Sequence, residues 1–202
     1  MDDRVNPRST RSLADKRLAF FQGFLREPQK VGSVIPSSRF LERRLVKISA
    51  VREARAVVEL GPGTGGTTHA LLRALPAAAR LLAIEIDPHF AALLRGEITD
   101  PRFAVEQASA EGIAGIAARH GLPAPDVVIS GIPFSTMPDT VGRAILRAVW
   151  AALAPGGRFV AYQFRDAVGV LGRDILGQPE VSLALLNVPP MRIYCWRKPA
   201  AA

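Results

Sequence analysis

Short apolar runs alternate with amphipathic stretches over most of this chain. Runs rich in Val, Ile, Leu and Ala predict strands near 56–60, 80–86, 102–106, 126–131 and 157–164. Helical spacing of apolar residues predicts helices near 66–75, 88–97, 109–119 and 138–153. Pro88 and Pro138 stand where the start of a helix tolerates proline. Strands that alternate with helices over this length predict an α/β fold with a doubly wound sheet.

The end of the chain has a different pattern. Two strand-like runs, 181–188 and 191–196, follow one another closely, with Pro189 and Pro190 between them. Strands joined so closely, without a helix, must be antiparallel. Five parallel strands followed by a hairpin are typical of a class I methyltransferase, with a mostly parallel seven-stranded sheet and a C-terminal antiparallel hairpin. We expect extra N-terminal helices before this domain.

The first 50 residues contain the pattern of these extra helices. From Thr10 to Arg26, Leu and Phe recur at helical spacing beside Arg and Lys, and Pro28 ends the pattern. Ser37 or Ser38 then stands where it caps a second helix that runs through Val46. We therefore expect residues 1–50 to form a lid that contacts a membrane, and residues 51–202 to form the methyltransferase domain.

Composition narrows the class of protein. The 202 residues suit one domain, and the single cysteine, Cys195, excludes an internal disulfide framework and fits a reducing compartment. Three scattered histidines and one cysteine predict no metal site. Charges interrupt every apolar run before it is long enough to span a membrane. The net charge of +8 indicates an anionic partner, either nucleic acid or an acidic lipid surface.

The segment 57–66 is the strongest indication of function. Glu59 ends an apolar run, glycines follow at 61, 63, 65 and 66, and Glu85 ends the next apolar run. Glycines let a ligand approach the backbone, and an acid at the tip of the second strand binds ribose hydroxyls. A dinucleotide fingerprint also fits these glycines. Glu59 suits an ammonium and repels a pyrophosphate, so S-adenosylmethionine is favoured over a dinucleotide.

The motifs resemble two methyltransferase families. The stretches 59–65, 83–87 and 132–134 resemble both the rRNA adenine dimethylases and the bacterial phospholipid N-methyltransferases. Three more resemble the second family: 31–41, 130–135 and 188–194. The adenine enzymes carry Asn or Asp at the position of Gly131, whose side chain holds the adenine amine. Their helical RNA-binding appendage also has no counterpart after the predicted sheet, so we expect no nucleic-acid partner.

The resemblance implies a set of cofactor contacts. Glycines 61, 63 and 65 would approach the methionine part, Glu59 the ammonium and Glu85 the ribose, with Ile86 on adenine. The adenine edge would meet Ala108, Ser109 and Ala110, although the family usually has an Asp at Ser109 or a neighbour. Backbone carbonyls near the sulfonium would come from Ser130, Gly131 and Ile132. Ser37 or Ser38 would either reach the carboxylate or only cap the helix. The product is S-adenosylhomocysteine.

The resemblance also implies the substrate. We expect methyl transfer to the amine of phosphatidylethanolamine and its methylated forms, towards phosphatidylcholine, by a cytoplasmic protein peripheral on the inner face of the membrane. Ser130, Gly131, Phe134 and Tyr162 are the candidate catalytic positions, with Asp139, Asp166 and His69 as other conceivable proton acceptors. Arg165 would pair the lipid phosphate and Tyr194 contact the headgroup, or these serve as a loop charge and strand packing. The expected membrane residues are Arg11, Lys16, Arg17, Phe20, Phe21 and Phe24.

Other interpretations stay open. The N-terminal helix is alternatively an amphipathic helix packed on the domain. Besides Phe134, Tyr162 and Tyr194, the aromatic side chains of Phe164 and Trp196 are candidates to surround a methylated ammonium, with core packing as the alternative. The rival functions are an RNA adenine N-methyltransferase and a basic lipid- or RNA-binding module that no longer uses its fold for catalysis.

Overall fold

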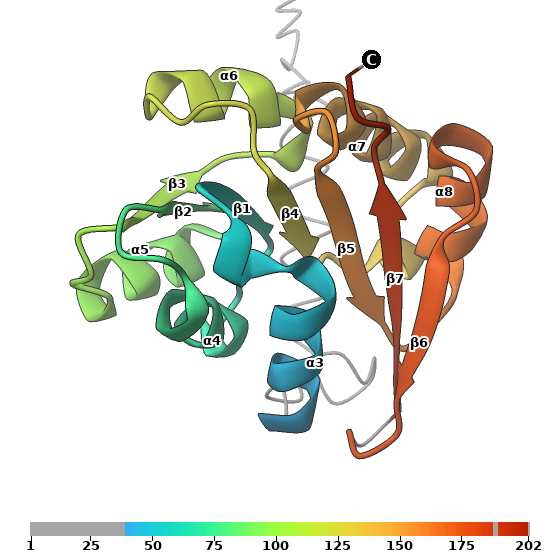
Figure 1. Cartoon of the computed structure of the whole chain (residues 1–202), viewed down its shortest axis with the longest axis horizontal. Helices are drawn as coiled ribbons and strands as arrows, with labels where there is room; N and C mark the ends of the chain where they lie inside the picture. Colours follow the sequence, from blue (N-terminus) through green and yellow to red (C-terminus); the bar gives the residue numbers. More distant parts are fainter. Residues whose placement is uncertain (1–38, 188–189, 202) are drawn as a thin grey trace, which may run out of the picture.

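A seven-stranded sheet runs through the middle of the molecule, with helices on both faces (Figure 1). The computed structural model describes residues 39–187 and 190–201. The strand order is β3-β2-β1-β4-β5-β7-β6. The strands are β1 Ala56–Leu60, β2 Arg80–Glu85, β3 Phe103–Gln107, β4 Val127–Ser130, β5 Arg158–Gln163, β6 Glu180–Ala184 and β7 Met191–Arg197. Only β7 is antiparallel to both its neighbours, β5 and β6, so the predicted parallel sheet with a final hairpin is confirmed.

Two layers of helices cover the sheet (Figure 1). One face carries α3 Arg39–Ser49, α4 Gly66–Ala74 and α5 Pro88–Glu97. The other face carries α6 Ile113–Arg119, α7 Asp139–Ala152 and α8 Ala167–Leu176. Short 3₁₀ turns complete the chain at η1 Val51–Glu53, η2 Ala110–Gly112 and η3 Phe134–Thr136. Successive side chains of β1 lie on opposite faces of the sheet and so belong to two separate cores. Val57 packs towards α3 and α4, and Val58 packs towards α6 and α7.

Helix α8 was not predicted from the sequence. Its apolar positions are interrupted by Gly169 and Gly172, and glycine is a weak helix former. The structure gives the reason for these glycines. A Cβ on Gly169 would lie 2.5 Å from Tyr194 Cε1, and one on Gly172 would lie 2.5 Å from Trp196 Cζ2. Glycine at these two positions lowers the helix propensity of α8, but it lets the helix lie directly on the rings of Tyr194 and Trp196 in β7.

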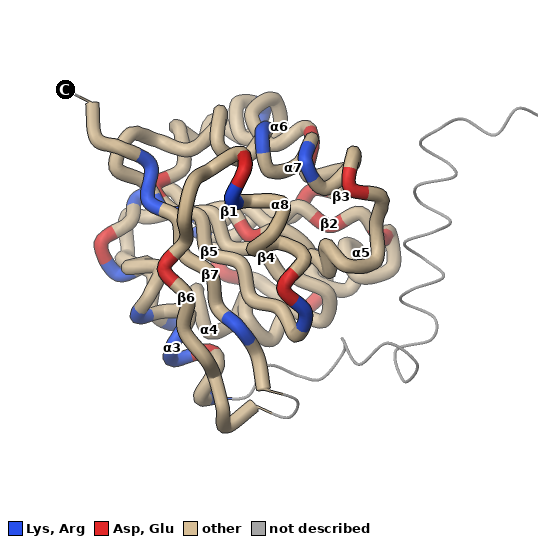
Figure 2. The backbone as a smooth tube through the Cα atoms, turned by 90° about the vertical axis from the view of Figure 1, so that its right-hand side faces the viewer, with Lys and Arg blue, Asp and Glu red and all other residues tan. Residues whose placement is uncertain are grey.

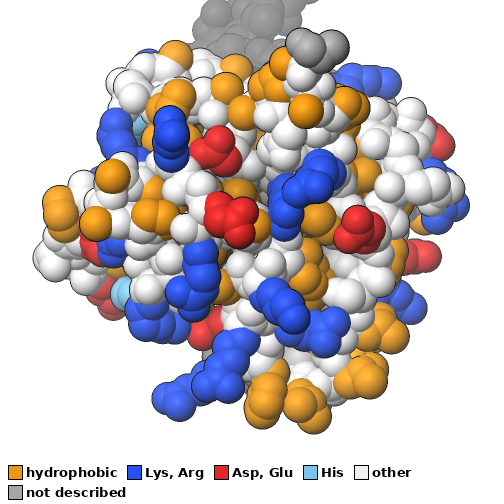
Figure 3. Space-filling view, in the orientation of Figure 1, with side chains coloured by type: hydrophobic (Ala, Val, Ile, Leu, Met, Phe, Trp, Pro, Cys, Tyr) orange, Lys and Arg blue, Asp and Glu red, His pale blue; other side chains and the backbone are white. Residues whose placement is uncertain are grey.

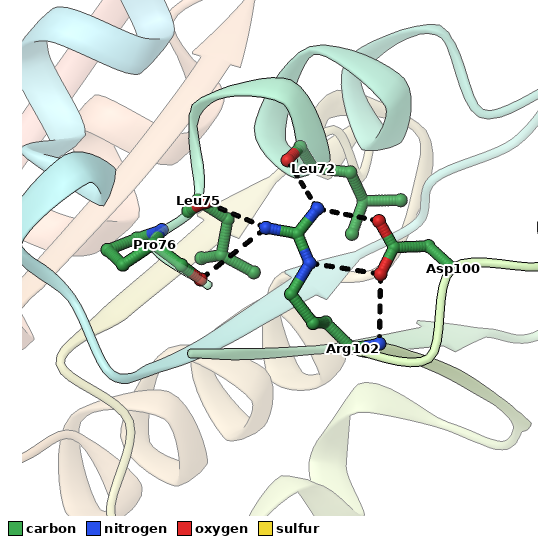
Figure 4. A network of polar contacts seen from close by, with 5 residues as sticks. All are labelled: Leu72, Leu75, Pro76, Asp100 and Arg102. Atoms are coloured by element: carbon green, nitrogen blue, oxygen red, sulfur yellow. Dashed lines mark hydrogen bonds and ion pairs between the residues drawn. The ribbon is translucent and has the colours of Figure 1, made fainter. Parts of the chain in front are cut away.

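An arginine from the loop before β3 fixes the end of α4 (Figure 4). The Arg102 guanidinium donates to the carbonyl oxygens of Leu72, at 2.9 Å, and Leu75, at 2.8 Å. It also donates to the carbonyl oxygen of Pro76 at 3.4 Å and to the carboxylate of Asp100 at 2.6 Å and 3.0 Å. The hydrogen bonds from Arg102 lower the pKa of Asp100 to about 2. Cationic donors satisfy the last carbonyls of a helix, so Arg102 holds α4 in place.

Helix α3 packs on the sheet through Leu41 and Leu45, which are buried. The described part of α3 begins at Arg39 and continues to Ser49, beyond the predicted end at Val46. The two serines and the 10–26 stretch lie outside the described residues, as do the expected membrane residues Arg11, Lys16, Arg17, Phe20, Phe21 and Phe24. Within residues 39–187 and 190–201, no helix is long and apolar enough to cross a membrane.

Candidate active site

The parallel strands end at one edge of the sheet, and the predicted site residues follow them. Leu60 at the end of β1 pairs with Ile84 of β2 on one side and Ser130 of β4 on the other. Ser130 in turn pairs with Ala161 of β5. The residues after each strand therefore meet at the same edge, at the point where the connections leave in opposite directions. Ligands of open α/β sheets bind at this kind of position.

The glycines of the loop from β1 to α4 provide a left-handed backbone conformation, close packing on α5 and an open backbone at the tip of the loop. Gly61, Gly63 and Gly65 have φ values of 67°, 56° and 83°, a region that other residues rarely adopt. A Cβ on Gly65 would lie 2.6 Å from Leu94 Cδ2, so this glycine lets the loop pack on α5. A Cβ on Gly63 would meet no atom within 4 Å, so the backbone there borders open space. The loop is thus close-packed behind and open at its tip.

Glu85 holds this loop against the end of β2. Its carboxylate accepts a hydrogen bond from the backbone N–H of Gly63 at 3.0 Å and another from that of Asp87 at 2.9 Å. The side chain is buried, and burial raises its pKa despite these two hydrogen bonds, which lower it. Each carboxylate oxygen can accept more than one hydrogen bond. Glu85 therefore shapes the loop and keeps acceptor capacity at the edge of the sheet.

Glu59 is a buried acid without a full set of partners. Its side chain is 1% exposed, and one oxygen accepts a 2.6 Å hydrogen bond from the Thr68 hydroxyl in the first turn of α4. The other oxygen, Oε1, has no hydrogen-bond partner among the described residues. Burial raises the pKa of Glu59 to about 7, with the Thr68 hydrogen bond lowering it and the Glu85 charge raising it further. A buried carboxylate of this kind is stabilised by a cation that reaches it.

Tyr162 stands directly over Gly131 at the end of β4. A Cβ on Gly131 would lie 2.6 Å from the Tyr162 hydroxyl oxygen and 3.1 Å from the carbonyl oxygen of Gly61. The same hydroxyl is hydrogen-bonded to that of Thr67 on α4, at 3.1 Å. Gly131 is thus a close-approach glycine, because a tyrosine from β5 occupies the volume of its missing side chain.

The rest of the β4 edge is held by internal hydrogen bonds. The backbone N–H of Ile132 donates to the hydroxyl of Ser130 at 3.2 Å. The carbonyl oxygen of Ile132 accepts from the backbone N–H of Phe134 at 3.0 Å and from the side-chain amide of Gln163. Because a carbonyl oxygen has two lone pairs, both hydrogen-bonding positions of the Ile132 carbonyl are occupied by groups of the protein. Its expected place near the sulfonium stays a prediction.

Phe134 and Tyr194 lie elsewhere than expected. Phe134 was predicted at the cleft, but its side chain is 1% exposed and packs in the core against α7, where a Cβ on Gly142 would lie 3.3 Å from it. Tyr194, a predicted headgroup contact, is buried under α8 and stacks on Trp196, with 5.9 Å between ring centroids. The side chains of these two aromatics form core on the far face, whereas Tyr162 lies on the α4 face.

The remaining predicted residues are distributed along the edge. The backbone N–H of Ala108 donates to the carbonyl oxygen of Glu85 at 3.0 Å, which places the 108–110 segment beside the end of β2. The Ser109 hydroxyl caps η2 by accepting from the N–H of Glu111 at 3.4 Å. Ile86 is half-buried next to Glu85, Ala110 is buried, and Arg165 is exposed just after β5. In the described part of the chain, no group of His, Cys, Asp or Glu is arranged to hold a metal ion.

These residues fit S-adenosylmethionine, the cofactor expected from the sequence. Its ammonium and sulfonium are cationic, and the unpartnered Oε1 of Glu59 is a buried anionic acceptor at this edge. Its ribose needs hydrogen-bond acceptors, which Glu85 provides beside the open backbone of Gly63. Thr67, Thr68 and Tyr162, which organise the site through hydroxyl hydrogen bonds, include two residues that the sequence did not single out, Thr67 and Thr68. They follow the glycine loop directly, in the first turn of α4.

Sequence comparison identifies a family and a lipid-modifying relative. A family model described as a methyltransferase domain matches residues 57–157. The ornithine lipid N-methyltransferase of Singulisphaera acidiphila is 33% identical over 141 residues, which are 69% of this chain and 73% of that protein. The ribosomal RNA small subunit methyltransferase A of Caulobacter vibrioides is 35% identical over 95 residues, but these cover only 46% of this chain and 34% of that protein.

Structure comparison supports the same fold. The 1,6-didemethyltoxoflavin-N1-methyltransferase of Burkholderia thailandensis, solved with bound 1,6-didemethyltoxoflavin and S-adenosylhomocysteine, superposes with a TM-score of 0.66. The match covers 98% of this chain and 93% of that one, at 17% sequence identity. At this identity the match defines the fold.

Proposed function

Because the chain belongs to the methyltransferase-domain family and its cofactor is S-adenosylmethionine, we propose that it methylates the amine of phosphatidylethanolamine. The mono- and dimethylated lipids are further substrates, on the way to phosphatidylcholine. The reaction takes place at the surface of the cytoplasmic membrane, on its inner face. The relationship to an ornithine lipid N-methyltransferase supports a lipid amine as the acceptor. The net charge of +8 supports an anionic surface as the place of reaction.

The observation that carries this proposal is the position of the Tyr162 hydroxyl over Gly131. In the adenine methyltransferases that the sequence resembles, an Asn or Asp at the position of Gly131 holds the planar amine. Here the missing side chain is replaced by Tyr162, whose hydroxyl oxygen would be 2.6 Å from a Cβ. A single hydroxyl does not offer the carbonyl acceptor that an adenine amine meets there. It suits a flexible alkyl amine, whose nitrogen can turn towards one acceptor.

The cofactor is held by groups already described. Glu59 binds the ammonium, the backbone of the 61–65 loop lies along the methionine part, and Glu85 binds the ribose. When bound, S-adenosylmethionine supplies a methyl group from its sulfonium to a neutral amine nitrogen and leaves as S-adenosylhomocysteine.

The chain's own contribution is to orient the amine and to exclude water. For the unmethylated and monomethylated lipids, the hydroxyl of Tyr162, fixed by its 3.1 Å hydrogen bond to Thr67, accepts an N–H of the neutral amine and so orients the nitrogen lone pair. The neutral dimethylated amine has no N–H, so this contact does not orient it. Correct orientation of two reactants accounts for much of the rate of such transfers. The exposed Arg165 pairs the lipid phosphate, and residues 1–50 contribute the contact with the membrane.

A second lipid amine, the ornithine headgroup, is favoured by one observation, the 33% identity to the Singulisphaera enzyme. The test is an incubation of the full chain with methyl-labelled S-adenosylmethionine and vesicles that contain phosphatidylethanolamine, ornithine lipid or phosphatidylglycerol, which has no amine. Label in phosphatidylethanolamine supports the proposal. Label only in ornithine lipid would show that ornithine lipid, and not phosphatidylethanolamine, is the substrate. Label in neither lipid overturns both candidate substrates.

A further inference from the structure

Large apolar side chains stand exposed at the edge of the sheet where the parallel strands end. They are Phe40 in the first turn of α3 (53% exposed), Phe164 after β5 (45%), Leu183 in β6 (49%), and Leu185 and Leu186 in the turn after β6 (68% and 66%). Figure 3 shows a group of hydrophobic side chains at the bottom of the molecule, below β6 and β7. Soluble surfaces carry scattered apolar residues, but a contiguous group of large ones marks an interaction site.

Strand pairing places this group at the edge of the sheet where β4 and β5 end. Gln163, the last residue of β5, pairs with Arg192 of β7, and Arg192 pairs with Leu183 of β6. Gln163, Arg192 and Leu183 therefore lie side by side across the three strands, and the turn that follows Ala184 projects beyond the end of β5. Helix α3 packs on β5, β6 and β7 with its first turn at the same end of the molecule (Figure 1). The exposed leucines and the proposed amine site thus share one edge of the sheet.

Arginines accompany the apolar side chains. Arg39 precedes Phe40, Arg165 follows Phe164, and Arg192 lies opposite Leu183. Along α3 the basic side continues with the exposed Arg43, about 6 Å further along the helix axis. Figure 2 shows this basic character of α3.

Acids offset this charge only in part. On α3, Glu42 is already paired with Arg73 at 3.2 Å. Asp166, next to Arg165, is the acid nearest in sequence to the group. Apolar side chains flanked by arginines are typical of surfaces that lie in the interface of an anionic bilayer.

We propose that this interfacial edge, made of Phe40, Phe164, Leu183, Leu185 and Leu186 with Arg39, Arg165 and Arg192, docks the protein on an anionic lipid bilayer. The leucines of the turn enter the boundary between headgroups and acyl chains, and the arginines meet the phosphates. The inference rests on the proposed function and deepens it, because docking by this edge brings lipid headgroups to the ends of β4 and β5. A lipid then needs no complete extraction from the bilayer to reach Tyr162.

An apolar substitution at the turn tests the docking. The full chain carrying Leu185→Gln and Leu186→Gln should bind vesicles of phosphatidylethanolamine and phosphatidylglycerol at least about tenfold more weakly, since two exposed leucines no longer enter the lipid. Its affinity for S-adenosylmethionine should stay unchanged. Val181→Gln is the matched control, because Val181 is 54% exposed on the same strand but set back from the turn. Equal binding by the double variant and the wild type, or an equal loss in the control, overturns the proposal.

A probe at the turn tests insertion directly. Tryptophan placed by Leu186→Trp should shift its emission to the blue and be quenched by bromine-labelled lipid, whereas Val181→Trp should not. Arg39→Gln with Arg43→Gln should weaken binding and reduce its salt dependence, while Arg147→Gln on α7, at the other face, should not. If the double leucine variant instead dissociates a dimer in sedimentation and leaves vesicle binding intact, the edge is an interface between copies of the chain.

The two proposals fail in different ways. Methylation of detergent-dispersed phosphatidylethanolamine reports the proposed function without requiring docking. If that lipid is methylated and the leucine variant still binds vesicles normally, the interfacial edge is wrong and the function stands. If vesicle binding depends on the leucines but neither dispersed nor bilayer lipid is methylated, the edge stands and the proposed lipid substrate is wrong.

Discussion

The buried Glu59 makes stability and cofactor binding depend on pH in opposite directions. Its pKa is about 7 in the folded protein without ligand, against 4.5 ordinarily. Between these values the folded state holds a proton that the unfolded state releases. This contribution to stability is therefore fully present below about pH 4.5 and is lost as the pH rises through 7. The shift from 4.5 to about 7 corresponds to a loss on the order of 3 kcal/mol for this buried group.

Glu59→Gln removes this titration while keeping the shape of the side chain and an oxygen for Thr68. From pH 4.5 to pH 8 the wild type should lose about 3 kcal/mol of unfolding free energy that the variant keeps. The stability of the variant relative to the wild type should therefore rise by about 3 kcal/mol over this range. Urea unfolding at several pH values, followed by tryptophan fluorescence, measures it. The pKa of Glu85 is also raised. Because Glu85 is present in both the variant and the wild type, its titration cancels in the difference between their unfolding free energies.

Two further results bear on the same reasoning. The variant should bind S-adenosylmethionine more weakly, and the affinity of the wild type should rise as the pH increases through 7, because the ionised carboxylate is the form that attracts an ammonium. Glu97→Gln, at an exposed position on α5, is the control for removal of a charge alone. A stability difference that stays constant between pH 4.5 and pH 8 would refute the assignment of the raised pKa to Glu59.

Three other predictions follow from close contacts. Gly131→Ala should lower methyl transfer at least about tenfold, because its Cβ would lie 2.6 Å from the Tyr162 hydroxyl and displace it. Addition of Tyr162→Phe removes that hydroxyl and relieves this contact, but it should not restore activity. Normal turnover in Gly131→Ala would contradict this. Glu85→Ala should weaken S-adenosylmethionine binding by about 1–3 kcal/mol in calorimetry, through loss of acceptors for Gly63 and the ribose; unchanged affinity would remove Glu85 from the site. Gly172→Ala should destabilise the protein by about 1–3 kcal/mol in urea unfolding, since α8 must move off Trp196; an unchanged midpoint would show that α8 adjusts freely.

The sequence predicted the parts of the fold whose pattern is local. The strands β1 to β5 are short apolar runs between turns, and they lie within one or two residues of their expected limits. The glycine loop could be placed because glycine has few other reasons to recur at 61, 63 and 65. Helix α8 could not be predicted, because its glycines are explained only by Tyr194 and Trp196, which lie more than twenty residues away in the chain.

The site was harder to predict than the fold, because a motif does not say which face a side chain takes. Phe134 follows β4 at the expected edge, yet η3 turns it under α7 and into the core. Tyr162 and Tyr194 lie on neighbouring strands, but only Tyr162 lies on the face that carries α4. The contact between Tyr162 and Gly131 depends on the packing of β5 beside β4, which no single stretch of sequence contains.

The competing explanation for the basic charge and the glycine loop is methylation of RNA, and one measurement separates it from the present account. The full chain is incubated with methyl-labelled S-adenosylmethionine, phosphatidylethanolamine vesicles and ribosomal RNA together, and both fractions are analysed for methyl groups. The account predicts label on the lipid amine, in mono-, di- or trimethylated products, and none on adenine. Label on the RNA with an unmodified lipid fraction would contradict it.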